Sequence, residues 1–269
     1  MAIKRISKRK HYRAMLRMML SLSKPLRVSL EKIFQRYSNR AKREYLNNNF
    51  ISEEYYDDFY RDVSQAMNKN VRLTVTAISN KMKQEEGLKQ EEIIIEQDGR
   101  FVPISPIVRA YINSTTAEKV TRVTQTTKKK IQRVIEKSLD DRLSEIDTAD
   151  AISSSTAFSR TRAKVIARTE THSALSYGQH EVARNLFLKG KKKSWLSAND
   201  DRTRDWHKVM NTRPPIPYDE DFIIYTPVAG GGVAEIPMEY TGDTKGGALN
   251  VINCRCQTLY FDVDTIVED

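Results

Sequence analysis

Apolar residues recur every three or four positions through most of the first 150 residues, which is the spacing of amphipathic helices. The pattern predicts a first helix over residues 11–46, with apolar positions at Tyr12, Met15, Leu16, Met19, Leu26, Leu30, Ile33, Phe34, Tyr37, Ala41 and Tyr45. Pro25 lacks the amide that an internal helical hydrogen bond needs, so we expect a break or kink near Ser23. Ser52, followed by two glutamates, has the pattern of a helix start and predicts a second helix over residues 52–83.

The pattern changes over residues 92–104. Two short β-patterned runs flank Asp98-Gly99, a dipeptide that suits a tight turn, so we expect a hairpin there. Ser105-Pro106 then opens a third helix, which we expect to reach Ile146. Its apolar positions are Val120, Val123, Thr127, Ile131, Val134, Leu139, Leu143 and Ile146. This spacing suits a helix of a plain bundle or the seam of a short coiled coil.

The stretch 147–155 is small and polar, and we place a domain boundary there. We expect a basic, mainly helical arm or bundle over residues 1–150 and a small domain over residues 151–269. The second part predicts a helix (160–188), a strand (194–197), a short helix (202–210), a Pro-rich loop (213–217), a Gly-rich loop (230–232) and a closing strand (256–263). The predicted fold class is therefore α+β, an extended N-terminal helical region followed by a small domain with a short sheet.

Basic charge is concentrated at the start of the chain. The net charge is +10, but residues 1–50 hold fourteen lysines and arginines against two glutamates, a net of +12, which leaves −2 for the remainder. Such localised charge indicates a polyanion or an acidic protein surface as the partner. The candidate nucleic-acid contacts are Lys4, Arg5, Lys8, Arg9, Lys10, Arg13 and Arg17. The alternative is an ordinary solvated helix face.

The chain has no apolar run of the ~18 residues that a membrane-spanning helix requires, and we expect no membrane contact. Its start is charged without the apolar stretch of a signal peptide, which suits a cytoplasm-like compartment. The only cysteines, Cys254 and Cys256, are two residues apart. A disulfide between them would be severely strained, so they are expected to be reduced thiols or part of a metal site.

Four short motifs mark the second half of the chain. They are Ala167-Arg168-Thr169-Glu170, the segment Trp195 to His207, the turn Tyr240-Thr241-Gly242-Asp243, and Asn253-Cys254-Arg255-Cys256. In this order they resemble the phage head morphogenesis family, the minor capsid proteins related to the F protein of phage Mu. The resemblance covers residues 155–262. The residues that carry it are Arg168, Thr169, Glu170, Trp195, Asp201, Arg204, His207, Gly242, Asp243, Asn253, Cys254, Arg255 and Cys256.

The resemblance implies a minor head protein of a tailed bacteriophage, a component that binds rather than catalyses. It implies a place in the procapsid and virion, inside the head near the portal vertex, after assembly in the host cytoplasm. The implied partners are the portal protein, the major capsid or scaffold protein, and packaged DNA. The sequence between His207 and Gly242 is long and rich in Pro and Gly, so family contacts in that loop do not transfer.

Two metal sites can be considered. His207, Cys254 and Cys256 could hold zinc with a fourth ligand such as His172, His180 or Asp205. The Cys-x-Cys spacing instead favours packed thiols that alternate along a strand start, and we expect no cofactor. The carboxylates of Asp200, Asp201 and Asp205 could hold Mg²⁺, but Asn199 or Asp200 is better interpreted as a helix N-cap.

An enzymatic alternative is a small nuclease in which His207 is the general base or acid and Arg204 or Arg255 stabilises a phosphate. The sequence contains no nucleophile elbow, and Gly230–Gly232 lacks the ending of a phosphate-binding loop. We therefore assign structural roles to the motifs. Arg168 and Arg255 are expected to pair with carboxylates of the Asp200–Asp205 segment, and Asn253 is expected to form a turn before the last strand.

Overall fold

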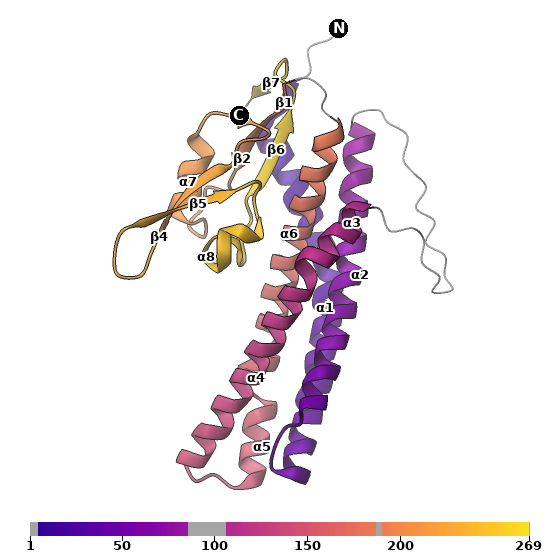
Figure 1. Cartoon of the computed structure of the whole chain (residues 1–269), viewed down its shortest axis with the longest axis vertical. Helices are drawn as coiled ribbons and strands as arrows, with labels where there is room; N and C mark the ends of the chain where they lie inside the picture. Colours follow the sequence, from indigo (N-terminus) through magenta and orange to yellow (C-terminus); the bar gives the residue numbers. More distant parts are fainter. Residues whose placement is uncertain (1–4, 86–105, 187–189, 269) are drawn as a thin grey trace, which may run out of the picture. The chain divides into compact units, whose positions relative to one another are not determined.

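The computed structural model describes residues 5–85, 106–186 and 190–268 (Figure 1). Lys4 and the predicted hairpin at 92–104 lie outside these residues. The chain forms two compact units whose segments interleave. The sheet unit comprises residues 1–22, 71–109 and 169–269, and the helical unit comprises residues 23–70 and 110–168. The boundary predicted near residue 150 falls inside the helical unit, and the division into domains at that point stays a prediction.

Helices dominate the first two thirds of the chain. They are α1 (Lys8–Asn48), α2 (Glu53–Glu85), α3 (Pro106–Tyr111), a π-helical turn (Ile112–Thr116), α4 (Ala117–Asp140), α5 (Glu145–Ser153), a 3₁₀ turn (Thr156–Phe158) and α6 (Arg160–Leu186). The predicted second helix is confirmed as α2. None of the described helices carries an apolar stretch long enough to cross a bilayer.

The expected break at Pro25 and the expected end of the third helix at Ile146 are wrong. Pro25 lies inside α1 without ending it, because buried Met19 and Leu26 on either side secure the helix by packing. The third predicted helix ends at Asp140, where Arg142 adopts a positive φ. The supposed seam residues Leu139, Leu143 and Ile146 are consequently exposed. The polar stretch after residue 147 is mostly helical, within α5, which Ser144 caps by accepting from the amide of Asp147.

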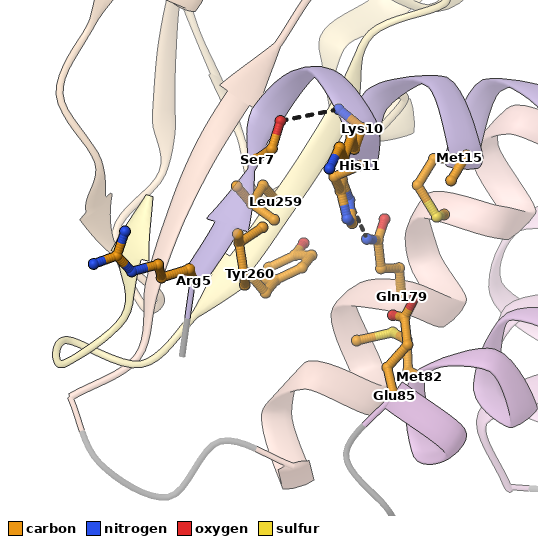
Figure 2. Close-up of a pocket in the computed structure, with 12 residues that line it drawn as sticks. Arg5, Ser7, Lys10, His11, Met15, Met82, Glu85, Gln179, Leu259 and Tyr260 are labelled. Atoms are coloured by element: carbon orange, nitrogen blue, oxygen red, sulfur yellow. Dashed lines mark hydrogen bonds between the residues drawn. The ribbon is translucent and has the colours of Figure 1, made fainter. Parts of the chain in front are cut away.

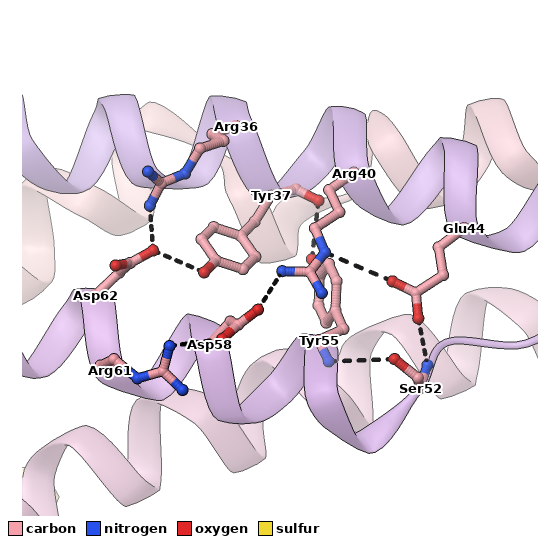
Figure 3. A network of polar contacts seen from close by, with 9 residues as sticks. All are labelled: Arg36, Tyr37, Arg40, Glu44, Ser52, Tyr55, Asp58, Arg61 and Asp62. Atoms are coloured by element: carbon pink, nitrogen blue, oxygen red, sulfur yellow. Dashed lines mark hydrogen bonds and ion pairs between the residues drawn. The ribbon is translucent and has the colours of Figure 1, made fainter.

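In the helical unit, α1 and α2 are joined by buried tyrosines and a chain of ion pairs (Figure 3). Arg40 contacts Asp58 at 2.6 Å, and Arg36 pairs with Asp62. The hydroxyl of Tyr37 donates to Asp62 at 2.6 Å, and that of buried Tyr55 donates to the carbonyl of Tyr37 at 2.9 Å. The predicted start of α2 is confirmed, because Ser52 Oγ accepts from the amide of Tyr55 at 3.2 Å.

A half-buried arginine, Arg162, contacts the same core. Arg162 of α6 donates to the carbonyls of Ala157 and Val123 and to Thr127 Oγ1, at 2.5, 2.9 and 2.9 Å. Its guanidinium also lies over the ring of Phe34, 5.3 Å from the centroid. Burial lowers the pKa of Arg162 to about 10. The charge is thus satisfied by backbone dipoles and an aromatic face rather than by a carboxylate.

The described residues of the sheet unit form three small sheets, of which several strands can be followed in Figure 1. Strand β2 (Lys192–Leu196) pairs antiparallel with β3 (Ile216–Pro217) and with β6 (Gln257–Phe261). Strands β4 (Phe222–Pro227) and β5 (Val233–Met238) form a hairpin, and β1 (Arg5–Ser7) pairs in parallel with β7 (Ile266–Glu268). Between these strands in the sequence lie helices α7 (Asp205–Thr212) and α8 (Gly247–Val251) and a 3₁₀ turn (Thr244–Gly246).

The predicted α+β class is confirmed, and the two predicted strands appear as β2 and β6. The β4–β5 hairpin was not expected. Its turn contains Gly230–Gly232, whose φ angles of 89, 94 and 91° explain why the predicted loop is glycine-rich. The short helix begins at Asp205 rather than Arg202, because residues 200–203 form a separate turn.

His180 of α6 is buried in the core of the sheet unit. Its ring stacks on Tyr218 at 4.6 Å between centroids, and its Nδ1 lies 3.1 Å from the Tyr260 hydroxyl. Burial lowers the pKa of His180 from 6.5 to about 3 and, more weakly, that of His11 to about 4. Both imidazoles are therefore neutral in the folded protein at neutral pH.

This neutrality predicts a loss of stability in acid. Above pH 6.5 neither state binds these protons; below it the unfolded chain binds them and the folded chain does not, down to about pH 4. The unfolding free energy should fall by up to roughly 1.4 kcal/mol per pH unit for each histidine. Denaturant titrations between pH 7 and pH 5 test this. His180→Gln should have the shallower slope, and an unchanged slope would contradict the assignment.

A buried junction of the sequence motifs

Motif residues from separate parts of the sheet unit meet in one place. We call it the motif junction and define it as Thr169, His172, Asp200, His207, Gly242, Asp243, Asn250 and Asn253–Cys256. Its first link joins α6 to the segment before β6. The backbone amide of Asn253 donates to Thr169 Oγ1 at 2.9 Å, and His172 Nε2 lies 2.6 Å from the carbonyl of Cys256. Because a carbonyl only accepts, His172 Nε2 is the donor and carries the proton.

The Gly-Asp turn packs against the same histidine. Gly242 has a φ of 79°, and a Cβ at this position would lie 2.7 Å from His172 Nδ1. Glycine is thus required both by its backbone conformation and by the close approach. Buried Asp243 accepts from the amides of Glu239 and Lys245 at 2.9 and 3.0 Å, and burial raises the pKa of its carboxyl. This motif therefore closes a turn rather than presenting an acid to solvent.

The predicted pairing of Arg255 with the Asp200–Asp205 segment is confirmed. Arg255 donates to both carboxylate oxygens of Asp200, at 2.8 and 2.6 Å. Asp200 also accepts from Thr203 Oγ1 at 2.9 Å, so it caps the 200–203 turn rather than helix α7. The Arg255 guanidinium holds the pKa of Asp200 well below its usual range. The neighbouring Asp201, one of the residues that carry the family resemblance, is exposed.

His207, Cys254 and Cys256 form a buried cluster whose ligand atoms all lie within 4.8 Å of one another. His207 Nδ1 is 3.7 Å from Cys254 Sγ and 3.5 Å from Cys256 Sγ. The amide of Cys256 also points to Cys254 Sγ, at 3.4 Å. Both sulfurs face the same ring nitrogen, so the two cysteines lie on the same side of the chain. Both thiols are buried, as the packed-thiol interpretation expects, whereas Arg255 between them reaches Asp200.

Asn250, which the sequence analysis missed, orients this cluster. Its Nδ2 donates to Thr226 Oγ1 at 2.8 Å and to the carbonyl of Gly246 at 2.9 Å. Its Oδ1 accepts from Trp206 Nε1 at 2.8 Å and faces His207 Nε2 at 3.1 Å. No sequence signal distinguished this asparagine from others in polar turns, because its partners come from three other segments.

The two thiols do not titrate alike. A hydrogen bond from Cys256 lowers the pKa of Cys254, whereas burial raises the pKa of Cys256. The two sulfurs therefore lie in unequal electrostatic surroundings. Trp195 packs edge-on against His207 at 5.2 Å between centroids and helps to keep water from the cluster.

Other candidate residues lie outside the cluster or serve the fold. Arg204 donates to the carbonyl of Ile252 at 2.7 Å. The three residues proposed as a fourth zinc ligand have other contacts. The ring of His180 contacts tyrosine hydroxyls, exposed Asp205 pairs with Lys208, and the ring of His172 donates to the backbone carbonyl of Cys256. Arg168 and Glu170 are half-buried on α6. Asp200, Asp201 and Asp205 do not come together as a metal-holding group among the described residues.

A cavity of about 410 Å³ lies elsewhere in the sheet unit (Figure 2). Its wall includes Arg5, Lys10, His11, Gln179 and Tyr260. His11 Nε2 lies 3.5 Å from Gln179 Nε2. The lining gathers none of the motif residues, so the motif junction is the candidate functional site.

A junction in which motif side chains bind one another is typical of a structural module rather than of a site that receives substrate. The family model described as Phage Mu protein F like protein matches residues 112–259, more than half of the chain. The chain therefore belongs to this family of phage head morphogenesis and minor capsid proteins. The match begins at Ile112, whereas the motif resemblance began at residue 155. Helices α4 and α5 therefore also belong to the region shared with the family. Comparison with curated proteins and with solved structures gave no significant match.

The contacts of His207 do not favour the nuclease alternative. A general base must reach the proton that it abstracts, yet His207 is 1% exposed and both of its ring nitrogens face protein atoms. Arg204 and Arg255 are likewise held by a carbonyl and a carboxylate. These residues are thus arranged to hold the fold together.

The Asp200–Arg255 pair offers a direct test of that role. Asp200→Ala leaves the largely buried Arg255 guanidinium without its carboxylate and removes the cap of the turn, so we expect a loss of about 1–2 kcal/mol in unfolding free energy. Asp201→Ala, the matched control at the exposed neighbour, should change it by less than about 0.5 kcal/mol. Denaturant unfolding of both variants measures this. Equal effects at the two positions would contradict the assignment.

Proposed function

We propose that the protein is a minor head protein bound at or near the portal inside the phage head, where it assists head assembly and DNA packaging or delivery. Membership of the Mu F-like family supports a role in the phage head. The observation that carries the binding role is that the motif side chains contact each other inside the fold. We therefore expect the binding residues on the surface of the molecule. The proposed partners are the portal protein, the major capsid or scaffold protein, and packaged DNA.

The first turns of α1 supply the surface that best fits packaged DNA. Arg9, Arg13 and Arg17 are four residues apart, so they share one face of the helix. All three are exposed and have no ion pair with a described residue. Lys10 is exposed beside them, whereas Arg5 pairs with Glu268. Guanidinium groups in such a row can contact successive backbone phosphates. These contacts are electrostatic and do not depend on the base sequence.

The later part of α1 is different, which narrows the proposal. Arg36, Arg40 and Lys42 pair with acidic residues of the helical unit, Asp62, Asp58 and Asp150. Part of the +12 charge of residues 1–50 is therefore neutralised within the fold. We therefore place the basic face that contacts DNA on the first turns of α1, at the three arginines and Lys10.

The head location predicts that the chain copurifies with phage particles. Mass spectrometry of purified procapsids and virions should detect it at low copy number, and mild disruption of heads should release it together with portal protein. Absence from both particles would reject the proposal. Presence in particles without the portal protein would retain the head role and reject the portal contact.

The proposed binding of DNA predicts a specific change in its salt dependence. The full chain with Arg9→Gln, Arg13→Gln and Arg17→Gln should bind a labelled duplex more weakly at low salt. The slope of log K against log salt should become shallower by roughly 0.9 for each phosphate that the variant no longer neutralises, or up to about 3. Fluorescence anisotropy across a salt series measures both quantities.

A second triple variant removes the same charge elsewhere on α1. Lys24, Lys32 and Arg43 are also exposed without a described ion pair, and their replacement by Gln should leave the slope nearly unchanged. If the first variant binds DNA like the parent chain, the arginine face serves a protein contact instead.

A further inference from the structure

The cluster of His207, Cys254 and Cys256 has the geometry of a metal site. A nitrogen and a sulfur bound to one tetrahedral zinc, at ~2.0–2.1 and ~2.3 Å, lie about 3.6 Å apart. The two nitrogen–sulfur distances in the cluster, 3.5 and 3.7 Å, fall on either side of this value. Both nitrogen–sulfur separations therefore match those of a zinc tetrahedron, and all three ligand atoms lie within 4.8 Å of one another.

The protonation of His207 is also the one that a metal requires. An indole N–H only donates, so the Asn250 atom that faces Trp206 is its oxygen. The same oxygen faces His207 Nε2, which must therefore carry the proton. The lone pair of His207 is left on Nδ1, directed at the two sulfurs. Metal-binding histidines are typically oriented in this way, by donating the other ring N–H to an oxygen acceptor.

Hydrogen bonding alone leaves this cluster incompletely satisfied. Nδ1 has one lone pair, so it can accept from only one of the two thiols that it faces. The amide of Cys256 is directed at Cys254 Sγ, which is therefore an acceptor in this contact. A cation among the three atoms would satisfy the lone pair and both sulfurs at once. A disulfide is no alternative, since the two cysteines are separated by one residue and are free.

We propose that His207, Cys254 and Cys256 bind a structural zinc ion that ties α7 to the segment before β6. Two thiolates and an imidazole select zinc among the common divalent ions. A cavity of about 10 Å³ borders the cluster and is lined in part by Ala198, Thr203 and Arg204. Its volume is of the order of one water molecule, which provides the fourth ligand. The ligands come from α7 and from the segment before β6, so the ion holds these two parts of the fold together.

The test uses the full chain, purified under reducing conditions with zinc supplied and then dialysed. Elemental mass spectrometry should find about one zinc per chain. Chelation should lower the melting temperature by roughly 10 °C or more, because binding free energy adds to folding free energy. His207→Ala and the double variant Cys254→Ser with Cys256→Ser should lose the metal. His180→Gln, a buried histidine outside the cluster, should keep it.

A titration of the wild-type chain with Co²⁺ tests the proposal even if these variants fail to fold. Co²⁺ added to the metal-free wild-type chain should give the intense visible bands of a tetrahedral site and a thiolate charge-transfer band in the near ultraviolet. A weak octahedral spectrum, or a wild-type chain that retains less than about one tenth of an equivalent of zinc, would overturn the proposal. Zinc retained by the double cysteine variant would also overturn it, since the metal would then lie elsewhere.

Discussion

The side-chain amide of Asn250 is the interaction on which the sheet unit most depends. It is 1% exposed and uses its full capacity, two donors and two acceptor sites, on Trp206, His207, Thr226 and Gly246. These partners come from α7, β4 and the turn before α8, so one buried group fixes three segments. A polar group in this position costs free energy unless every hydrogen bond is made. The arrangement therefore specifies one packing of the segments and, through His207, one tautomer.

The sequence predicted those parts of the fold that depend on local spacing. Helix α2 followed from a serine cap and a long apolar stripe, and β2 and β6 followed from short apolar runs between turns. The continuity of α1 through Pro25 could not be predicted, because it depends on burial of Met19 and Leu26, which local propensity does not report. The helical seam expected at Leu139 and Leu143 was wrong for the opposite reason. Their spacing is helical, but the chain turns at Asp141 and leaves both side chains exposed.

The motif junction was predicted only as a set of residues. Order along the chain identified His207, Cys254, Arg255 and Cys256, and the pairing of Arg255 with a nearby acid followed from charge. Which acid was involved could not be predicted, because Asp200 and Asp201 are adjacent and only the geometry of the 200–203 turn distinguishes them. Lys193 was equally hidden: within a run of three lysines it is buried and donates to the carbonyl of Glu239 at 2.7 Å.

The junction also explains why motifs so far apart in sequence occur together in one module. Thr169 satisfies the amide of Asn253, His172 satisfies the carbonyl of Cys256, and Gly242 leaves the space that His172 occupies. Removing one partner leaves a buried polar atom unpaired on another segment, which costs more than the net gain of the original bond. Each motif is therefore useful only when the others are present. What these motifs require of one another is that each buried polar group finds a hydrogen-bond partner, which is a requirement of folding.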